Sequence, residues 1–399
     1  MFIEKIDSFY SEMVAIREDL HRHPELSYQE VRTSGIVIEK LKEYGVDEVK
    51  QIFNTGVVAL IKGNRGEGKC IAIRADMDAL PVTEDTGLEF SSENAGVMHA
   101  CGHDLHVATL LAAAKLLCDS RDFKGSVKLI FQPAEEAANP KDTSGGAKPM
   151  VEHGCLENPK VDAIIGLHVN PCADKPGAFG LRKGIITSGF DVYRFDVYGK
   201  TAHGSQPHTG NDAVLAMSQL IVMLQQVVSR NTDPLKTAIL TVGTIQGGSA
   251  INVIPDHVYA GGVFRYYDNE TAKVIEEHTM SIARGIESIS GCKVEVKALP
   301  GYRCVDNDGD MVDLCEEALK EELGEDMVFH MADPASGSED FSHYSIAAGI
   351  PCSFMWLNTA PVEGTELSPL HSSKCAMVSD SIKTGASGLA SIAVKYLNK

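Results

Sequence analysis

Short apolar runs alternate with segments of helical hydrophobic spacing through the first half of the chain. The apolar runs are VVALI (57–61), CIAIRAD (70–76), SVKLIF (126–131) and VDAIIGLHV (161–169), and the clearest helical segment is DLHVATLLAAAKLL (104–117). Continuous apolar strands that alternate with helices are typical of a mostly parallel sheet covered on both faces. The first half of the chain therefore predicts an α/β domain.

The hydrophobic pattern changes near residue 186. FDVYRFDVYG (190–199), TAILTVGTIQ (237–246) and DHVYAGGVFRYYD (256–268) alternate apolar with polar residues, which is typical of antiparallel strands buried on one face. Helical spacing occupies 211–230 and recurs at about 270–289. The order strand, helix, strand, strand, helix, strand predicts a compact α+β module.

The α/β pattern returns in the last part of the chain, with the apolar run IPCSFMWLN (350–358) followed by a C-terminal helix. We therefore expect one domain built from residues 1–185 and 299–399, with a second domain inserted between them at 186–298.

Composition and charge narrow the classes of protein. A length of 399 residues favours two or more domains, and 44% hydrophobic with 23% charged residues is ordinary for a soluble globular protein. The formal net charge of −19 argues against binding to nucleic acid or to an anionic membrane surface, because both favour a basic face.

The expected location is the cytoplasm. The first twenty residues carry charges every few positions and lack the apolar core of a signal peptide, and no stretch reaches the roughly 18 apolar residues of a membrane span. The ten cysteines are scattered without paired spacing, so most should be free and buried, as in a reducing compartment.

Metal-binding side chains follow several of the predicted strands. Because the carboxyl ends of parallel strands meet at one edge of a sheet, we expect these side chains to lie together. They are Asp76 and Asp78 after the 70–76 run, Glu135 and Glu136 after the 126–131 run, His168 in GLHV, and His99, Cys101, His103 and Asp104 in the loop MHACGHD.

Two of these groups have a specific chemistry. Cys101 and His103 stand two apart with Gly102 between them, and thiolate and imidazole are good ligands for zinc and similar ions. Of the adjacent carboxylates Glu135 and Glu136, one can bind a metal ion while the other moves a proton. Taken alone, CGH is also typical of a buried cysteine beside a capping histidine, and EE of a solvated pair.

Nine motifs in order resemble a known family. They are RADMDALP, MHACGHDLHVATLLAAA, IFQPAEE, GGAKPM, GLHV, GKTAHGSQPH, INVIPD, GSEDFS and LH. Across essentially the whole chain, the sequence resembles the aminoacylase/carboxypeptidase-type dinuclear metallohydrolases. It is most similar to the branch of N-acyl-amino-acid amidohydrolases, hippurate hydrolases and auxin–amino-acid conjugate hydrolases. The resemblance implies a zinc-aminopeptidase-like α/β catalytic domain with an inserted α+β lid and dimerisation domain.

The resemblance also implies site residues. Glu135 would be the general base and acid, with Asp78 beside it among the catalytic residues. Asp76 stands where other branches place a metal-binding histidine, so it is either a ligand or a residue behind one. Two divalent ions, zinc foremost but with manganese, cobalt or nickel open, would be held by Cys101, His103, Glu136, His168 and His371, with Cys101 bridging.

Three residues of the inserted domain are implied to meet the substrate. His203 matches a histidine that reaches across a dimer to the scissile carbonyl, and Asn252 resembles a second polar contact. Arg265 resembles a substrate-carboxylate clamp, for which a bidentate guanidinium is well suited. One departure from the family is the segment AANPKDTS (137–144), which is longer than usual and is expected to reshape the mouth of the site.

The expected activity is metal-dependent hydrolysis of the amide bond of N-acyl amino acids or small dipeptides, by a homodimer or a higher homo-oligomer. The acyl group and the amino acid are left open. One alternative is a cysteine amidase, with Cys101 as nucleophile and His103 or His168 as its base. The other is a non-catalytic, metal-dependent binding protein, which would have no use for Glu135.

Overall fold

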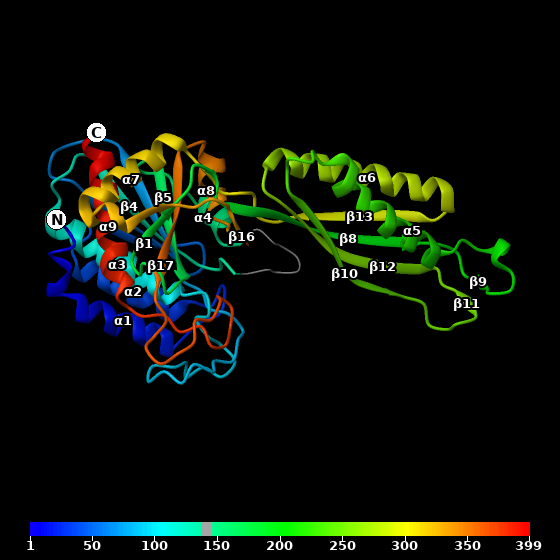
Figure 1. The fold of residues 1–399 in the computed structure, drawn as a ribbon, viewed down its shortest axis with the longest axis horizontal. Helices are drawn as coiled ribbons and strands as arrows, with labels where there is room; N and C mark the ends of the chain where they lie inside the picture. The colour runs from blue at the N-terminus through cyan, green and yellow to red at the C-terminus, as the bar shows by residue number, and fades with distance from the viewer. Residues whose placement is uncertain (137–144) are drawn as a thin grey trace.

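The computed structural model describes residues 1–136 and 145–399, so the segment AANPKDTS lies outside the described residues. The molecule has two lobes (Figure 1). One lobe is a layered α/β structure that carries both termini, and the other is an elongated sheet with two helices on one side. The expected fold class, an α/β domain with an inserted α+β unit, is confirmed.

The first lobe is built on an eight-stranded sheet in the order β1-β2-β4-β3-β5-β17-β6-β15. The four central strands run parallel, whereas β1, β2 and β6 each pair antiparallel with a neighbour. The central runs are apolar throughout because both faces of the sheet are covered. The strands are β1 (Glu48–Ile52), β2 (Gly56–Lys62), β3 (Cys70–Asp76), β4 (Ser126–Gln132), β5 (Ala163–Pro171), β6 (Phe179–Leu181), β15 (Val328–His330) and β17 (Cys352–Thr359).

Helices cover both faces of this sheet, and each face has its own apolar core. On one face α3 packs against α1 and α9, which explains why it is buried along almost its whole length. On the other face α4 packs against α8. The helices are α1 (Tyr10–Arg22), α2 (Val31–Glu43), α3 (His103–Ser120), α4 (Ala147–Glu152), α7 (Gly309–Leu323), α8 (Ser342–Ala348) and α9 (Ser381–Asn398).

The second lobe is an antiparallel sheet in the order β10-β12-β8-β13, joined at β8 by the short parallel strand β16 (Ala335–Ser338). Buried and less buried residues alternate along β12, as the period-two pattern predicted, because α5 and α6 cover one face. The elements are β8 (Thr187–Tyr198), α5 (Ala213–Gln226), β10 (Ala238–Gly247), β12 (His257–Tyr266), α6 (Asn269–Ser290) and β13 (Lys293–Pro300).

Short elements complete the chain. At the end of the second lobe farthest from the large sheet, β9 pairs with β11 (Figure 1). Near the junction of the lobes, β7 pairs with β14. These elements are β7 (Gly184–Ile185), β9 (Ala202–His203), β11 (Val253–Ile254) and β14 (Asp306–Asn307), with the helical turns η1 (Ile6–Ser8), η2 (Pro207–Thr209), η3 (Val227–Asn231) and η4 (Glu325–Met327).

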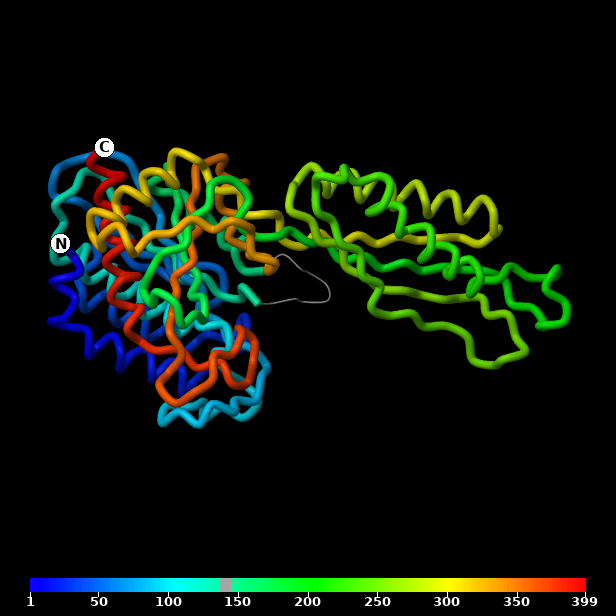
Figure 2. The backbone as a smooth tube through the Cα atoms, viewed as in Figure 1, coloured from blue at the N-terminus to red at the C-terminus, as the bar shows by residue number. Residues whose placement is uncertain are grey.

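The chain enters the second lobe on β8 and leaves it on β13, and these two strands pair side by side (Figure 2). We propose 186–298 as the inserted domain on this basis. Among the described residues, one helical segment, Ala213–Asn231, is long and apolar enough by length and composition to cross a membrane, and a third of it is buried. Its buried side chains, such as Met217 and Leu220, pack into the core of this lobe.

The separate cores predict separate stabilities. Phe195 of β8 is fully buried in the core of the second lobe, which shares no residue with the two cores of the large sheet. Phe195→Ala should cost about 3–5 kcal/mol of local stability through the cavity it leaves. Hydrogen exchange should therefore quicken in 187–300 alone, whereas Leu129→Ala in β4 should quicken it in the large sheet. Equal loss of protection in both lobes from Phe195→Ala would contradict independent cores.

Candidate active site

The predicted site residues meet at one edge of the large sheet. Since β3, β4 and β5 are parallel, the loops after β3 and β4 and His168 near the end of β5 share that edge. Gly102, between Cys101 and His103, has φ +84°, and a Cβ there would lie 2.5 Å from Val169 Cγ2. Only glycine fits this close turn into α3, which explains the spacing of the CGH motif.

The five predicted ligands form two groups that share Cys101. Its Sγ lies 3.3 Å from His168 Nε2 and 3.2 Å from His371 Nε2, which in turn lies 3.0 Å from Glu136 Oε1. Within each group the ligand atoms lie within 4.8 Å of one another. The groups are Cys101, His103 and His168, and Cys101, Glu136 and His371.

The donor set fits divalent metal ions. His103 Nδ1 lies 2.8 Å from the Asp78 carbonyl and His168 Nδ1 lies 2.7 Å from the Val169 carbonyl. A carbonyl only accepts, so each Nδ1 carries a proton, which makes each Nε2 the nitrogen whose lone pair can bind a metal ion. His103 Nε2 is buried and has no hydrogen-bond partner among the described residues. A buried lone pair without a partner is what a metal ligand requires.

Two positions at the site have left-handed backbone. His371 has φ +65° and Ala134, directly before Glu135, has φ +56°. Such conformations are costly for residues other than glycine and gather at functional sites, where the surrounding structure imposes them. The His371 backbone is held by a hydrogen bond from its N–H to the Ala100 carbonyl at 2.8 Å.

Asp76 lies beside the predicted ligand His103, with Oδ2 3.7 Å from His103 Nε2, and forms a further group of potential ligands with His103 and His106. Its carboxylate accepts from Arg74 at 2.7 Å and bonds His106 Nδ1, while His106 Nε2 accepts from the Val169 backbone N–H at 2.9 Å. Both nitrogens of His106 are therefore used. Burial alone would raise the pKa of Asp76, but Arg74, His103 and His106 together hold that pKa well below its usual range. Both expected roles for Asp76, metal ligand or residue behind one, therefore stay predictions.

Glu135 and Cys101 are buried among negative charges. Burial, Glu339 and Glu136 raise the pKa of Glu135 well above its usual range. Burial, Glu136 and Glu135 likewise raise the pKa of the Cys101 thiol. Both groups therefore need positive charge nearby to ionise.

A cavity of about 300 Å³ opens beside this cluster. Arg265 reaches it from β12 of the second lobe, with Nη1 donating to Ser338 Oγ at 3.1 Å. Its other hydrogen bonds, to Ser188 Oγ and the Ser336 carbonyl at 3.4 Å each, also go to uncharged oxygens. The Trp356 ring lies 5.2 Å from the His168 ring, and its buried Nε1–H has no partner among the described residues. The apolar part of the lining is Phe190, Tyr302, Phe354, Trp356 and Leu370.

His203 and Asn252 do not line this cavity. His203 is on β9, at the far end of the second lobe (Figures 1 and 2), and its Nδ1 lies 2.7 Å from Ser205 Oγ. Asn252 is its neighbour there, since its carbonyl accepts from the Gly204 N–H at 2.8 Å. The structure thus brings these two residues together but leaves both away from Cys101 of the same chain.

The other residues of the MHACGHD loop do not join the ligand groups. Asp104 turns inward and accepts from Arg17 at 2.8 Å, with His21 Nδ1 at 2.9 Å, which ties α3 to α1. His99 is buried nearby, with its ring 6.3 Å from that of His21.

Sequence reasoning missed an acidic pair behind Glu135. Glu339 and Asp340 belong to the motif GSEDFS, which was noted but given no role. Arg74 Nη2 donates to Glu339 at 2.9 Å and to Asp340 at 3.0 Å, and these acids gather with Glu135 into a further group. The sequence signal that could have indicated these residues is that two acids, Glu339 and Asp340, are adjacent in the motif GSEDFS.

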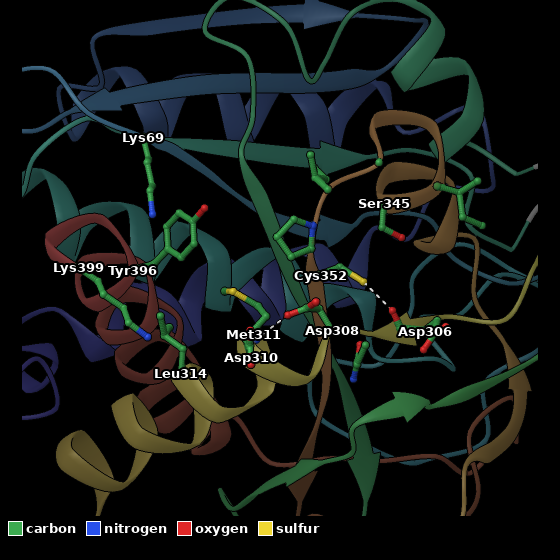
Figure 3. Close-up of a pocket in the computed structure, with 15 residues that line it drawn as sticks. Lys69, Asp306, Asp308, Asp310, Met311, Leu314, Ser345, Cys352, Tyr396 and Lys399 are labelled. Carbon is green, nitrogen blue, oxygen red and sulfur yellow. Dashed lines mark hydrogen bonds between the residues drawn. The ribbon is translucent and has the colours of Figure 1, made fainter.

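The largest cavity described, about 820 Å³, lies elsewhere (Figure 3). It sits where β3 and β17 begin and is lined by residues such as Lys69, Asp308 and Tyr396. None of the groups of potential metal ligands lies in it. We therefore place the candidate active site in the smaller cavity, at the opposite edge of the sheet.

Comparison with known proteins agrees with this geometry. The sequence model described as Peptidase family M20/M25/M40 matches residues 72–395. The chain belongs to this family. It is 40% identical over 357 residues to N-acetyl-L-cysteine deacetylase of Bacillus subtilis, covering 89% of this chain and 82% of that protein. It is 37% identical over 396 residues to hippurate hydrolase of Campylobacter jejuni, covering 99% of each.

A solved structure is also similar. The Bacillus subtilis YXEP protein, described as a dinuclear metal-binding peptidase of family M20, has a TM-score of 0.82 and 35% identity, with 98% of this chain and 99% of that chain covered. The family expected from the motifs is thus confirmed, and this protein is a metallohydrolase of the M20 family.

The shared thiol gives a sharp prediction for metal content. If Cys101 bridges two ions, Cys101→Ser should lower the bound divalent metal from about two ions per chain to well below one. Cys118→Ser, a half-buried cysteine at the other end of α3, should leave the metal content unchanged. Mass spectrometry of metals after dialysis measures both. Loss of only one ion from Cys101→Ser would show that Cys101 binds a single metal.

Proposed function

We propose that this protein hydrolyses the amide bond of N-acyl amino acids or small dipeptides, releasing a free amino acid and a carboxylic acid. The observation that carries the proposal is the pair of ligand groups sharing Cys101, directly beside the buried carboxylate of Glu135. The names of the relatives, a deacetylase and a hippurate hydrolase, point to the same reaction.

Two divalent ions, zinc foremost because of the thiolate, would be held by the five ligands. When bound, the ions supply Lewis acidity to the scissile carbonyl and lower the pKa of the attacking water. The ligands are Cys101, His103, Glu136, His168 and His371.

Glu135 is proposed as the residue that moves the proton. A carboxylate oxygen of Glu135 lies within 4.8 Å of ligand atoms of His103 and Glu136, so it borders the place where water would attack. Glu135 takes the proton from the water and passes it to the departing amine. The Tyr302 hydroxyl, which donates to the Glu135 carbonyl at 2.5 Å, and Asp78, which accepts from its N–H, hold the backbone on both sides.

The cavity beside the metal ligands suggests how the substrate binds. Arg265, whose hydrogen bonds go to uncharged oxygens, is proposed to bind the α-carboxylate of the amino acid. The aromatic walls formed by Phe190, Phe354 and Trp356 favour an apolar or aromatic acyl group.

A second copy of the chain is proposed to complete the site. His203 and Asn252 lie too far along the second lobe to serve the site of their own chain, so a partner would supply them to the oxyanion. An apolar surface on the second lobe is suited to this pairing. Strand β10 lies at the edge of its sheet and exposes Ile239 and Ile245. Helix α5 exposes Leu215 and Val222.

The two alternatives are less well supported. A nucleophilic cysteine needs a low thiol pKa, whereas burial and two neighbouring carboxylates raise the pKa of Cys101. A binding protein would not need Glu135 beside the ligands. All ten cysteines are free, which fits a reducing compartment, and we propose the cytoplasm.

A substrate panel tests the activity. Amine release from N-acetyl, N-benzoyl and aminoacyl amino acids should stop with EDTA and return with Zn²⁺ or Mn²⁺, with the lowest KM for N-benzoyl substrates. Glu135→Gln should lower kcat by roughly 100- to 10,000-fold without loss of metal. Glu322→Gln, a buried glutamate whose Oε1 accepts from the Ile3 N–H, is the control. Amine release that is unaffected by EDTA but stops with iodoacetamide would contradict the metal-dependent mechanism and support Cys101 as a nucleophile.

Mixing two inactive variants tests the second copy. His203→Ala should lower kcat by roughly 100- to 1,000-fold through loss of one oxyanion donor. After His203→Ala and Glu135→Gln are unfolded and refolded together, mixed dimers contain one site with both residues intact, so part of the activity should return. Each variant refolded alone is the control. If mixed dimers form but are no more active than either variant alone, His203 does not serve the site of the partner chain.

A further inference from the structure

The backbone N–H groups of three successive residues, Ala134, Glu135 and Glu136, each donate to a buried carboxylate. The Ala134 N–H donates to Glu30 Oε1 at 2.9 Å. The Glu135 and Glu136 N–H groups donate to Asp78 Oδ1 and Oδ2, each at 3.0 Å. Two acids from distant parts of the chain therefore shape the turn that presents Glu135 and Glu136.

Glu30 is the less expected of the two. It belongs to the segment ELSYQE, before α2, and its side chain is fully buried. Besides the Ala134 N–H, Oε1 accepts from the Tyr28 N–H at 3.0 Å, and Oε2 accepts from Thr55 Oγ1 at 2.6 Å. Glu30 thus joins its own loop, the start of β2 and the turn after β4.

The same segment also holds Asp78. Ser27 Oγ donates to Asp78 Oδ2 at 2.6 Å, and the Ala79 N–H donates to the Glu25 carbonyl at 2.8 Å. Residues 25–30 therefore fix the second acid while supplying the first. Asp78 Oδ1 also lies 3.3 Å from His103 Nδ1. Residues 25–30 are therefore connected, through Asp78, both to the turn at Ala134 and to a proposed metal ligand.

The turn requires such support. Ala134 has φ +56°, a conformation that a residue with a Cβ adopts only when its surroundings enforce it. Without an acceptor for its N–H, Ala134 can relax to a negative φ, and Glu135 and Glu136 would then change direction. A displacement of about 1 Å in a catalytic group lowers rates by roughly 100-fold.

We propose that Glu30 is a positioning residue of this reaction: its Oε1 holds the Ala134 N–H and thereby sets where the Glu135 and Glu136 carboxylates lie. The proposal rests on the function proposed above for Glu135. In this role Glu30 acts as a hydrogen-bond acceptor: the backbone N–H groups of Tyr28 and Ala134 both donate to Oε1, and one neutral carbonyl oxygen can accept both.

This distinction predicts different behaviour for two substitutions. The carbonyl oxygen of a glutamine can accept from Tyr28 and Ala134 as Oε1 does, and the Thr55 hydroxyl can turn to accept from its NH₂ group. Burial and the nearby Asp78 raise the pKa of Glu30 to about 7. Alanine offers no acceptor.

Glu25 provides a matched control. Its carboxylate also accepts three hydrogen bonds, from the Arg32 N–H, the Thr33 N–H and Thr33 Oγ1 at 2.9–3.0 Å, but none comes from the turn. Glu25→Ala therefore removes as many hydrogen bonds from the same segment without touching Ala134.

The experiment compares kcat, KM and metal affinity of the full-length protein carrying Glu30→Ala, Glu30→Gln or Glu25→Ala. We expect Glu30→Ala to lower kcat by roughly 10- to 100-fold with KM almost unchanged. It should also weaken binding of the ion held by Glu136, measured by competition with a metal indicator. Glu30→Gln should restore both values to near wild type, and Glu25→Ala should leave both near wild type.

Other outcomes overturn the proposal. Glu30→Ala with wild-type kcat and metal affinity would show that the turn keeps its shape unaided. Glu30→Gln as impaired as Glu30→Ala would show that Glu30 acts through its charge. If Glu30→Ala does not fold, Glu30→Met fills a similar space without an acceptor and should show the same losses. If the wild type cleaves no substrate, the proposed function fails, and metal affinity alone still decides the role of Glu30.

Discussion

Buried negative charge at the carboxyl edge of the large sheet is the constraint on which the site depends. Carboxylates and a thiol are packed there out of water, where an isolated charge is strongly disfavoured. Arg74, fully buried, neutralises part of this charge by donating to Asp76, Glu339 and Asp340. Arg74 also lowers the pKa of Glu135, but burial and the neighbouring carboxylates raise that pKa by more, and His371 pairs with Glu136. Metal ions fit this deficit of positive charge.

The backbone around this charge is correspondingly constrained. Ala134 and His371 have left-handed conformations, and Gly102 permits a turn that no other residue fits. Their positions are imposed by hydrogen bonds from elements far apart in the sequence, including the segment that carries Glu30. The surrounding structure thus supports the strain at the edge where the potential ligands gather.

The inserted lobe contributes to two places at once. Its base, with Arg265 and Phe190, borders the cavity of its own chain, while its far end carries His203 away from that cavity (Figure 1). Under the proposed function, this one lobe would bind substrate on its own chain and complete the site of a partner chain. The exposed apolar residues of α5 and β10 are the part of this lobe that a partner would cover.

The sequence by itself determined the fold class, and it predicted which potential metal ligands gather at the carboxyl edge of the large sheet. These follow from local signals: the hydrophobic period of each segment, the order of strands and the motifs at strand ends, such as CGH and PAEE. Only the tertiary structure decided that Asp76 is bonded to Arg74 and His106, that Glu339 and Asp340 stand beside Glu135, and that Glu30 holds Ala134. Glu30 and Ala134 are more than 100 residues apart in the sequence and meet only through a hydrogen bond between a side chain and the backbone. Such a bond leaves no periodic or compositional signal, because the backbone N–H that it uses is present in every residue except proline.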